Sequence, residues 1–223
     1  MKRRLGILGA CLLLLAGNAA FGKENDFQLW TELKLSHSFG KSPWTLYWAT
    51  ENRFDNDVTN YQTFNTTIGF DYKILKWLRA GFFYRFEKVD GKPRENRIFP
   101  QFEVAKVLGP VELSTRQRFE IRFFPDETKF RYRPRYRVGF PIKTSPVSFK
   151  PYFSDELFFE PGFGGFDQNR FAVGNAFGFM KDKITFDLYY MLKSTEQSGT
   201  AGTPSGTNWT QAQVLGTSLG FKF

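Results

Sequence analysis

The sequence has a single cysteine, Cys11, and a single histidine, His37. Cys11 lies in an apolar stretch near the start, so the rest of the chain has neither a disulfide framework nor a thiolate metal site. A membrane-spanning helix needs about 20 apolar residues, and no stretch after residue 22 approaches this length. No segment shows a helical period. These absences exclude a disulfide-stabilised domain, a zinc–cysteine domain and a helical membrane protein.

The first 22 residues have the layout of a secretory signal peptide. Three cations at positions 2–4 precede an apolar run, Leu5–Ala16, and small residues follow up to Gly22, where we expect cleavage. We weighed a lipoprotein signal at Cys11, but the apolar run continues beyond it. Removal of this segment would leave 28 Lys and Arg against 22 Asp and Glu, a net charge of +6.

Residues 23–223 alternate apolar and polar side chains in segments separated by turns. Alternation with period two predicts β-strands, and such segments of about ten residues are the signature of a transmembrane β-barrel. The chain also contains 28 Phe, for which a soluble domain has no obvious use. We predict an all-β fold: one domain forming a closed antiparallel transmembrane β-barrel of 10–12 strands. The segments lie near residues 27–35, 44–53, 64–71, 78–87, 95–104, 111–123, 129–140, 147–156, 168–179, 184–190 and 215–223.

These eleven segments conflict with the even strand number of single-chain bacterial barrels. With the C-terminus in the periplasm, LGP and MKDK become periplasmic turns, while VDGKPREN and the 194–207 loop lie outside. Residues 27–36 then run from the outer side of the membrane toward the periplasm. Three explanations stay open: one segment is not a full strand, a strand near EPGFGGF was missed, or the N-terminal segment threads the barrel. Ten or twelve strands are favoured.

Three prolines and five tryptophans have expected positions in such a barrel. Proline removes a hydrogen bond from the strand ladder, so we expect bulges or the membrane boundary at Pro100, Pro134 and Pro151. The tryptophans lie near predicted strand ends more often than not, which suits the aromatic girdles of such a barrel. They are Trp30, Trp44, Trp48, Trp77 and Trp209.

Several short sequence motifs occur along the chain in an order that resembles a known family. They include TENRF at 50–54, GFFYRF at 81–86, RENR at 94–97, RQRFEIR at 116–122, RYRPRYRV at 131–138, NRFAVG at 169–174 and the final GFKF. Together they resemble an uncharacterised bacterial family, domain of unknown function 2490, whose members are predicted outer-membrane barrels. The resemblance covers nearly the whole mature chain. It implies the fold and the location but no activity.

The stretch KFRYRPRYRVGF at 129–140 places a cation at every second position, interleaved with aromatics. A nucleic-acid surface would need those aromatics to be exposed beside the cations, whereas here they take the opposite face. The polar face is therefore interpreted as the wall of an enclosed interior. The predicted charge cluster of that interior consists of Glu95, Arg97, Glu103, Glu112, Arg116, Arg118, Glu120, Arg122, Arg131, Arg133, Arg135, Arg137 and Glu156.

The charge balance of this cluster leaves two interpretations open. Between residues 94 and 137 ten inward cations face four carboxylates, although Glu51, Glu87 and Glu156 could reach in from other strands. In a purely structural network the numbers of cations and carboxylates would be more nearly equal. Because unpaired buried cations are costly, an excess implies water, a bound anion or a lipid phosphate inside the barrel.

Catalytic groups are scarce. Barrel lipid hydrolases use Ser and His, but Ser36 and Ser38 would point away from His37 on a strand. A carboxylate-only protease site using Asp155, Glu156 or Asp187 stays open, although mid-strand carboxylates are usually pairing partners. We expect no enzyme, no metal site and no cofactor.

The sequence therefore predicts an outer-membrane barrel with an Arg/Glu-lined interior, acting as a narrow anion-preferring channel or solute passage. The alternative is a non-conducting structural or lipid- and lipopolysaccharide-interacting barrel, and a hydrolase ranks third. Expected partners are outer-membrane lipid, lipopolysaccharide and, through the terminal Phe223, the barrel-assembly machinery; nucleic acid is not expected. We expect a monomer in the bacterial outer membrane, exported through the periplasm.

Overall fold

The computed structural model describes residues 25–144, 146–161, 165–196 and 209–223, so the predicted signal peptide lies outside the described residues. Within these ranges the chain is all-β, and no helix in them could span a membrane. The strands are β1 (Asn25–Ser38), β2 (Trp44–Asp55), β3 (Asn60–Leu75), β4 (Leu78–Val89), β5 (Glu95–Leu108), β6 (Val111–Phe123), β7 (Thr128–Gly139), β8 (Ile142–Lys143), β9 (Ser148–Glu160), β10 (Gly165–Phe179), β11 (Ile184–Glu196) and β12 (Trp209–Lys222).

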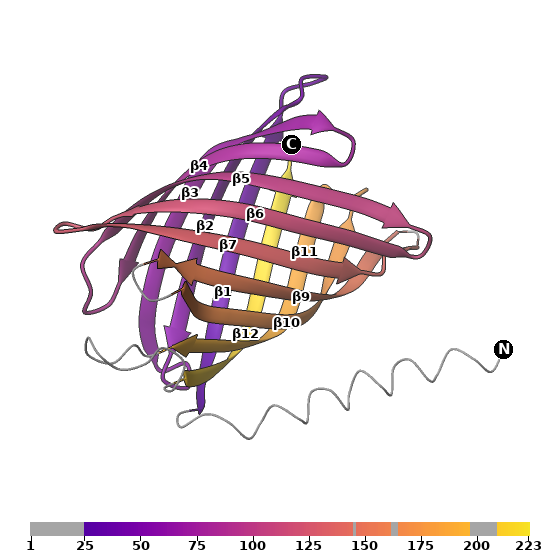
Figure 1. Ribbon diagram of the computed structural model, residues 1–223. Coiled ribbons are helices and arrows are strands. Elements are labelled where there is room, and N and C mark those ends of the chain that lie inside the picture. The colour runs from indigo at the N-terminus through magenta and orange to yellow at the C-terminus, as the bar shows by residue number, and fades with distance from the viewer. Residues whose placement is uncertain (1–24, 145, 162–164, 197–208) are drawn as a thin grey trace.

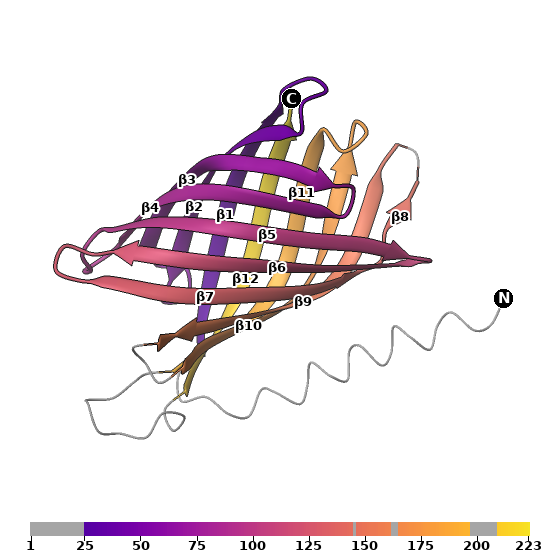
Figure 2. The same cartoon turned by 45° about the horizontal axis from the view of Figure 1, so that its top comes forward.

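The strands form one closed barrel (Figures 1 and 2). Each strand pairs with its sequence neighbours, except that the two-residue β8 adds to one end of β9, while β7 pairs directly with β9. β1 then pairs with β12 and closes the ring. Among the described residues eleven strands make up the barrel wall, which lies within the predicted 10–12, but the preference for an even number is wrong.

Closure occurs through a parallel pair. β1 lies parallel to β12, in register from Asn25 opposite Gln211 to Ser36 opposite Lys222, whereas the other pairs are antiparallel. An odd number of consecutive strands requires one parallel pair, since the first and last strands then run the same way. The inferred direction of residues 27–36, parallel to the last strand, is therefore confirmed. The predicted antiparallel barrel is instead mixed, and mostly antiparallel.

None of the three explanations for the odd count is needed. Residues 27–36 form part of a full wall strand rather than threading the interior. β9 and β10 are adjacent, with Glu160 opposite Gly165, so no wall strand was missed between them. The turns LGP and MKDK lie at the same end of the barrel as Phe223, as predicted from the sequence.

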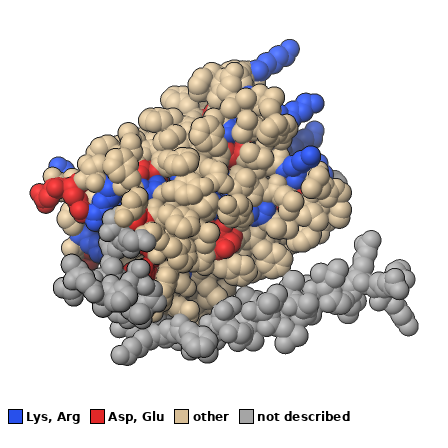
Figure 3. Space-filling model, in the orientation of Figure 1, with Lys and Arg blue, Asp and Glu red and all other residues tan. Residues whose placement is uncertain are grey.

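The outer face is apolar and aromatic. Side chains of alternate residues project outward, and many are substantially exposed, among them Phe82, Phe119 and Phe130. Uncharged side chains dominate the face seen in Figure 3. Outward polar groups pair with one another: Tyr84 donates to Asn96 at 2.7 Å, and Asn169 donates to Asp155 at 2.6 Å.

No bulge lies at Pro100, Pro134 or Pro151, so that alternative is wrong, while the membrane boundary stays a prediction. Register shifts in the wall lie at other positions, such as between Phe166 and Gln168. At Pro100 the register of β5 with β4 and β6 is continuous, and at Pro134 so is that of β7 with β6 and β9. Because proline lacks an N–H, the wall loses pairings beside Pro134 instead of gaining a residue.

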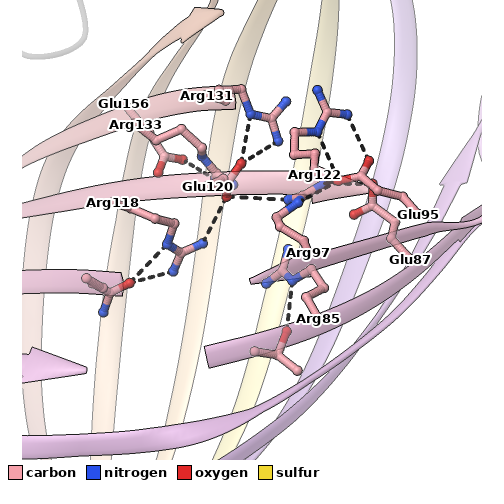
Figure 4. A network of polar contacts seen from close by, with 12 residues as sticks. Arg85, Glu87, Glu95, Arg97, Arg118, Glu120, Arg122, Arg131, Arg133 and Glu156 are labelled. Atoms are coloured by element: carbon pink, nitrogen blue, oxygen red, sulfur yellow. Dashed lines mark hydrogen bonds and ion pairs between the residues drawn. The ribbon is translucent and has the colours of Figure 1, made fainter. Parts of the chain in front are cut away.

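The barrel interior, called the lumen below, has two different walls. On one side Trp30, Ala172, Met191 and Val214 form a buried apolar cluster on β1, β10, β11 and β12, with Tyr189 packed against it. The opposite wall, formed by β4–β9, carries charged side chains (Figure 4). Most ion pairs therefore lie on one side of the interior, while Arg53 on β2, Arg170 on β10 and Lys193 on β11 add charge elsewhere around it.

Candidate functional site: a charged lumen

Glu120 on β6 is the centre of the charged wall. The residue is 1% exposed. Oε2 accepts from Arg131 Nη2 at 2.7 Å, and Oε1 accepts from Arg133 Nη1 at 2.7 Å. Arg97 lies at 3.4 Å and Arg118 at 3.8 Å from the same carboxylate. One carboxylate thus contacts guanidinium groups from β5, β6 and β7 (Figure 4).

Three further carboxylates extend this network toward the end of the barrel where β5 begins. Glu95 accepts from Arg97 at 2.5 Å and from Arg122 at 2.8 Å. Arg122 also donates to Glu160 at 2.7 Å, and Arg97 lies 3.4 Å from Glu87. These contacts join β4 and β9 to the strands between them.

Toward the other end, Glu156 on β9 accepts from Arg133 at 3.1 Å and from Arg116. All of these residues belong to one connected network of six arginines and five glutamates. The arginines are Arg97, Arg116, Arg118, Arg122, Arg131 and Arg133, and the glutamates are Glu87, Glu95, Glu120, Glu156 and Glu160.

The excess of cations inferred for residues 94–137 is therefore an overestimate. It counted one stretch of chain, whereas Glu87, Glu156 and Glu160 reach the same arginines from β4 and β9. Six arginines against five glutamates come close to the parity expected of a structural network. Glu87 and Glu160 are not in the predicted cluster, because alternation places them inward without identifying their partners.

The other predicted cluster members lie outside this network. Glu112 pairs with Lys150 at 2.8 Å. Arg137 pairs with Asp187 at 3.5 Å and stacks on Tyr152. Two more, Glu103 and Arg135, line the lumen without an ion pair to any described residue.

Three arginines that the predicted cluster omitted also face the lumen. Arg53 on β2 is paired with Glu51. Arg85 on β4 donates through Nε to the Thr67 hydroxyl at 2.8 Å. Arg170 on β10 donates through Nε, at 2.8 Å, to the side-chain oxygen of Gln168 in the amide orientation that satisfies both groups. Within the described chain, Arg85 and Arg170 thus have neutral partners and no carboxylate within ion-pair distance.

Aromatic rings hold several of these guanidinium groups in place. The Cζ atoms of Arg53 and Arg170 lie 3.9 and 4.8 Å from the centroid of the Trp30 ring. Arg170 and Arg133 lie 4.6 and 4.4 Å from the Phe158 ring. Trp30 is 4% exposed inside the lumen, so its assignment to an outer aromatic girdle is wrong. Cation–π contacts fix a guanidinium without cancelling its charge.

Cavities follow one another along the lumen. A central cavity of about 360 Å³ adjoins a second one of about 190 Å³, and both are lined by Arg53, Arg85, Arg133 and Arg170. These four residues are called the arginine belt below. The second cavity shares Gln62, Lys92, Lys193 and Thr195 with a cavity at one mouth, and the central one shares Asp71 with a cavity at the other. The four cavities therefore form a series from end to end.

Comparison with known proteins identifies the family. A family model described as "Protein of unknown function (DUF2490)" matches residues 27–203. The chain belongs to the DUF2490 family. The match spans β1–β11 and confirms the resemblance seen in the sequence, but the family description assigns no activity. Comparison with curated proteins found no match.

The candidate catalytic groups of this DUF2490 barrel are not assembled into one site. Asp155 lies on the outer face of β9 and Glu156 on its inner face, where Glu156 is held by arginines. His37 packs edge-on against Phe39. The neighbouring hydroxyls have other partners, since Ser36 donates to the carbonyl of Phe221 and Ser38 lies 3.3 Å from Thr45.

Proposed function

We propose that this DUF2490 protein is a monomeric outer-membrane barrel that forms a narrow passage for small solutes and prefers anions. The apolar outer face supports a lipid environment, because soluble monomers rarely expose large contiguous apolar surfaces. The terminal Phe223 is 69% exposed, while its backbone is held by Ser36 and Ser38, so its ring is accessible to assembly machinery. In the membrane this surface would contact lipid and lipopolysaccharide.

The series of cavities carries the proposal. It runs from one mouth to the other, and its centre is lined by the arginine belt. The central cavity is lined by nine Lys and Arg against six Asp and Glu, and the second by eight against one, so positive charge predominates along this path. Cation-lined constrictions select anions in other pores.

A second candidate is a barrel that does not conduct and serves as a membrane scaffold or lipid-interacting protein. The ion-pair network favours it, because eleven mutually paired side chains fill one wall and rigidify it. Phe99 and Phe158 are also fully buried within the lumen and occupy space there.

Conductance in planar lipid bilayers separates the two candidates. The refolded protein should give small, discrete current steps in KCl, and a salt gradient should give a reversal potential of the sign that marks chloride preference. Arg135→Gln should weaken that preference about two- to fivefold, because a unit charge about 4 Å from an ion contributes about 1 kcal/mol in water.

Lys88→Gln is the matched control, since it removes one cation from the outer face of β4 rather than from the lumen. It should leave selectivity unchanged. Absence of current steps at every salt concentration would refute the passage. Equal changes of reversal potential in the two variants would show that lumen charge is not the source of the anion preference.

A further inference from the structure

The arginine belt has an electrostatic property that the ion-pair network lacks. Arg53 and Arg133 are balanced by Glu51, Glu120 and Glu156. The other two members, Arg85 and Arg170, donate to a hydroxyl and to an amide oxygen, which are neutral. Two positive charges therefore remain uncompensated at the junction of the two inner cavities.

These charges are held in position by the fold. Arg170 lies between the rings of Trp30 and Phe158, which also carry Arg53 and Arg133 on their faces. Trp30 is itself fixed, because its indole N–H donates to Gln28 at 3.1 Å. Stacking occupies the face of a guanidinium and leaves its in-plane N–H groups free to donate. The belt is thus rigid without being neutralised.

Unused donors are present in the belt. Arg133 is 5% exposed, and its buried Nε has no hydrogen-bond partner among the described residues. Arg85 is 9% exposed and has one hydrogen bond, made through Nε, so its two terminal nitrogens are unused within the described chain. An unpartnered buried polar atom is costly and calls for a ligand or water. Here several such donors line the same two cavities.

We propose that the arginine belt is a binding site for a phosphate group. Its two uncompensated charges match the roughly two negative charges of a phosphate near neutral pH. Guanidinium forks bind phosphate oxygens through paired hydrogen bonds, and the belt offers such forks from β2, β4, β7 and β10. The ligand is a small phosphate-bearing compound. The inference rests on a solvent-accessible lumen, which is the premise of the proposed passage.

Calorimetric titration of the detergent-solubilised protein with inorganic phosphate at low ionic strength tests this site. The wild type should show saturable binding of one phosphate per barrel. Arg85→Gln and Arg170→Gln should each weaken binding about tenfold, because each removes a charge-assisted hydrogen bond. Arg170→Lys keeps the charge but loses the fork, so its affinity should be intermediate.

Arg79→Gln is the matched control, since Arg79 is an exposed residue on the same face of β4, near its end. Its affinity should stay within about twofold of wild type. Heat-modifiable gel mobility of each variant confirms that the barrel has formed. No saturable binding to the wild type, or equal affinities for all variants, would overturn the site.

A parallel titration with dihexanoyl phosphatidic acid distinguishes a lipid phosphate from a soluble one. Binding about tenfold weaker in Arg85→Gln and Arg170→Gln for either compound supports the site, and the compound that binds more tightly to the wild type identifies the source. Phosphate binding without bilayer conductance would uphold the site and refute the passage. Conductance without arginine-dependent phosphate binding would uphold the passage and refute the site.

Discussion

Glu120 is the carboxylate on which the charged wall depends most. It is almost completely buried and lies within ion-pair distance of Arg97, Arg118, Arg131 and Arg133. Burying an ion costs several kcal/mol, about the amount that good pairing restores. Because one carboxylate serves four arginines, its loss would leave more than one cation without compensation.

Replacing Glu120 by Gln should therefore destabilise the barrel strongly. We expect the free energy of unfolding to fall by about 3–5 kcal/mol, the usual cost of removing one partner from a buried ion pair. The measurement is the shift in the urea midpoint for the protein folded into lipid vesicles, followed by heat-modifiable gel mobility.

Glu112→Gln provides the comparison, since Glu112 pairs with one cation, Lys150, and both side chains are partly exposed. In this variant the free energy of unfolding should fall by less than about 1 kcal/mol. Similar shifts for the two variants would mean that the network contributes no more than an isolated surface pair.

The sequence places most of these side chains inside the barrel but does not pair them. Strict alternation is enough to assign Arg131 and Glu120 to the inner face. The contacts of Arg122 with Glu160 and of Arg116 with Glu156 join residues 38 and 40 positions apart. Such partners depend on which strands meet across the lumen, and alternation carries no information on that.

The parallel pair β1–β12 is the least expected pairing in the barrel. It determines that Asn25, at the start of β1, lies opposite Gln211 of β12 and that Phe223 lies beside Ser38. Its register places Leu33 opposite Leu219, both on the outer face. An antiparallel closure would place these residues in different pairings.

A double variant, Leu33→Cys with Leu219→Cys in a Cys11→Ser background, should form an intramolecular disulfide under a membrane-permeable oxidant. Paired residues on neighbouring strands are about 4.8 Å apart, which suits disulfide geometry. Non-reducing gel electrophoresis of the unfolded chain would show the altered mobility.

Leu33→Cys with Leu215→Cys is the matched control, because Leu215 lies four residues, about 13 Å, along the same face of β12. It should not cross-link. A disulfide in the control and none in the test pair would contradict the parallel register.

The eleven strand segments were predictable because each has an apolar outer face and a lumen face, and that two-sided environment forces alternation. Residues 111–123 show it most clearly and form β6 as predicted. Trp30 was assigned to the wrong face because the sequence does not distinguish an aromatic side chain on the outer face from one in the lumen. No bulge forms at the prolines because a barrel wall tolerates a lost pairing beside Pro134 without changing register.

The barrel as a unit separates an apolar exterior from a charged interior. This separation explains how 28 Phe and many arginines coexist in one chain. The lumen combines a paired wall, which stabilises the fold, with the arginine belt, which remains positive. An aqueous and positively charged lumen is the claim on which both the passage and the phosphate site depend.

Thiol labelling of two positions on β9 tests that claim most directly. Ser154 lines the central cavity, and Leu157 lies on the outer face of the same strand. In vesicles, Ser154→Cys in the Cys11→Ser background should react with methanethiosulfonate reagents, and faster with an anionic than with a cationic one after correction for intrinsic reactivity. Leu157→Cys should not react. Labelling of Leu157→Cys with none of Ser154→Cys, or faster reaction of Ser154→Cys with the cationic reagent, would contradict an aqueous, positively charged lumen.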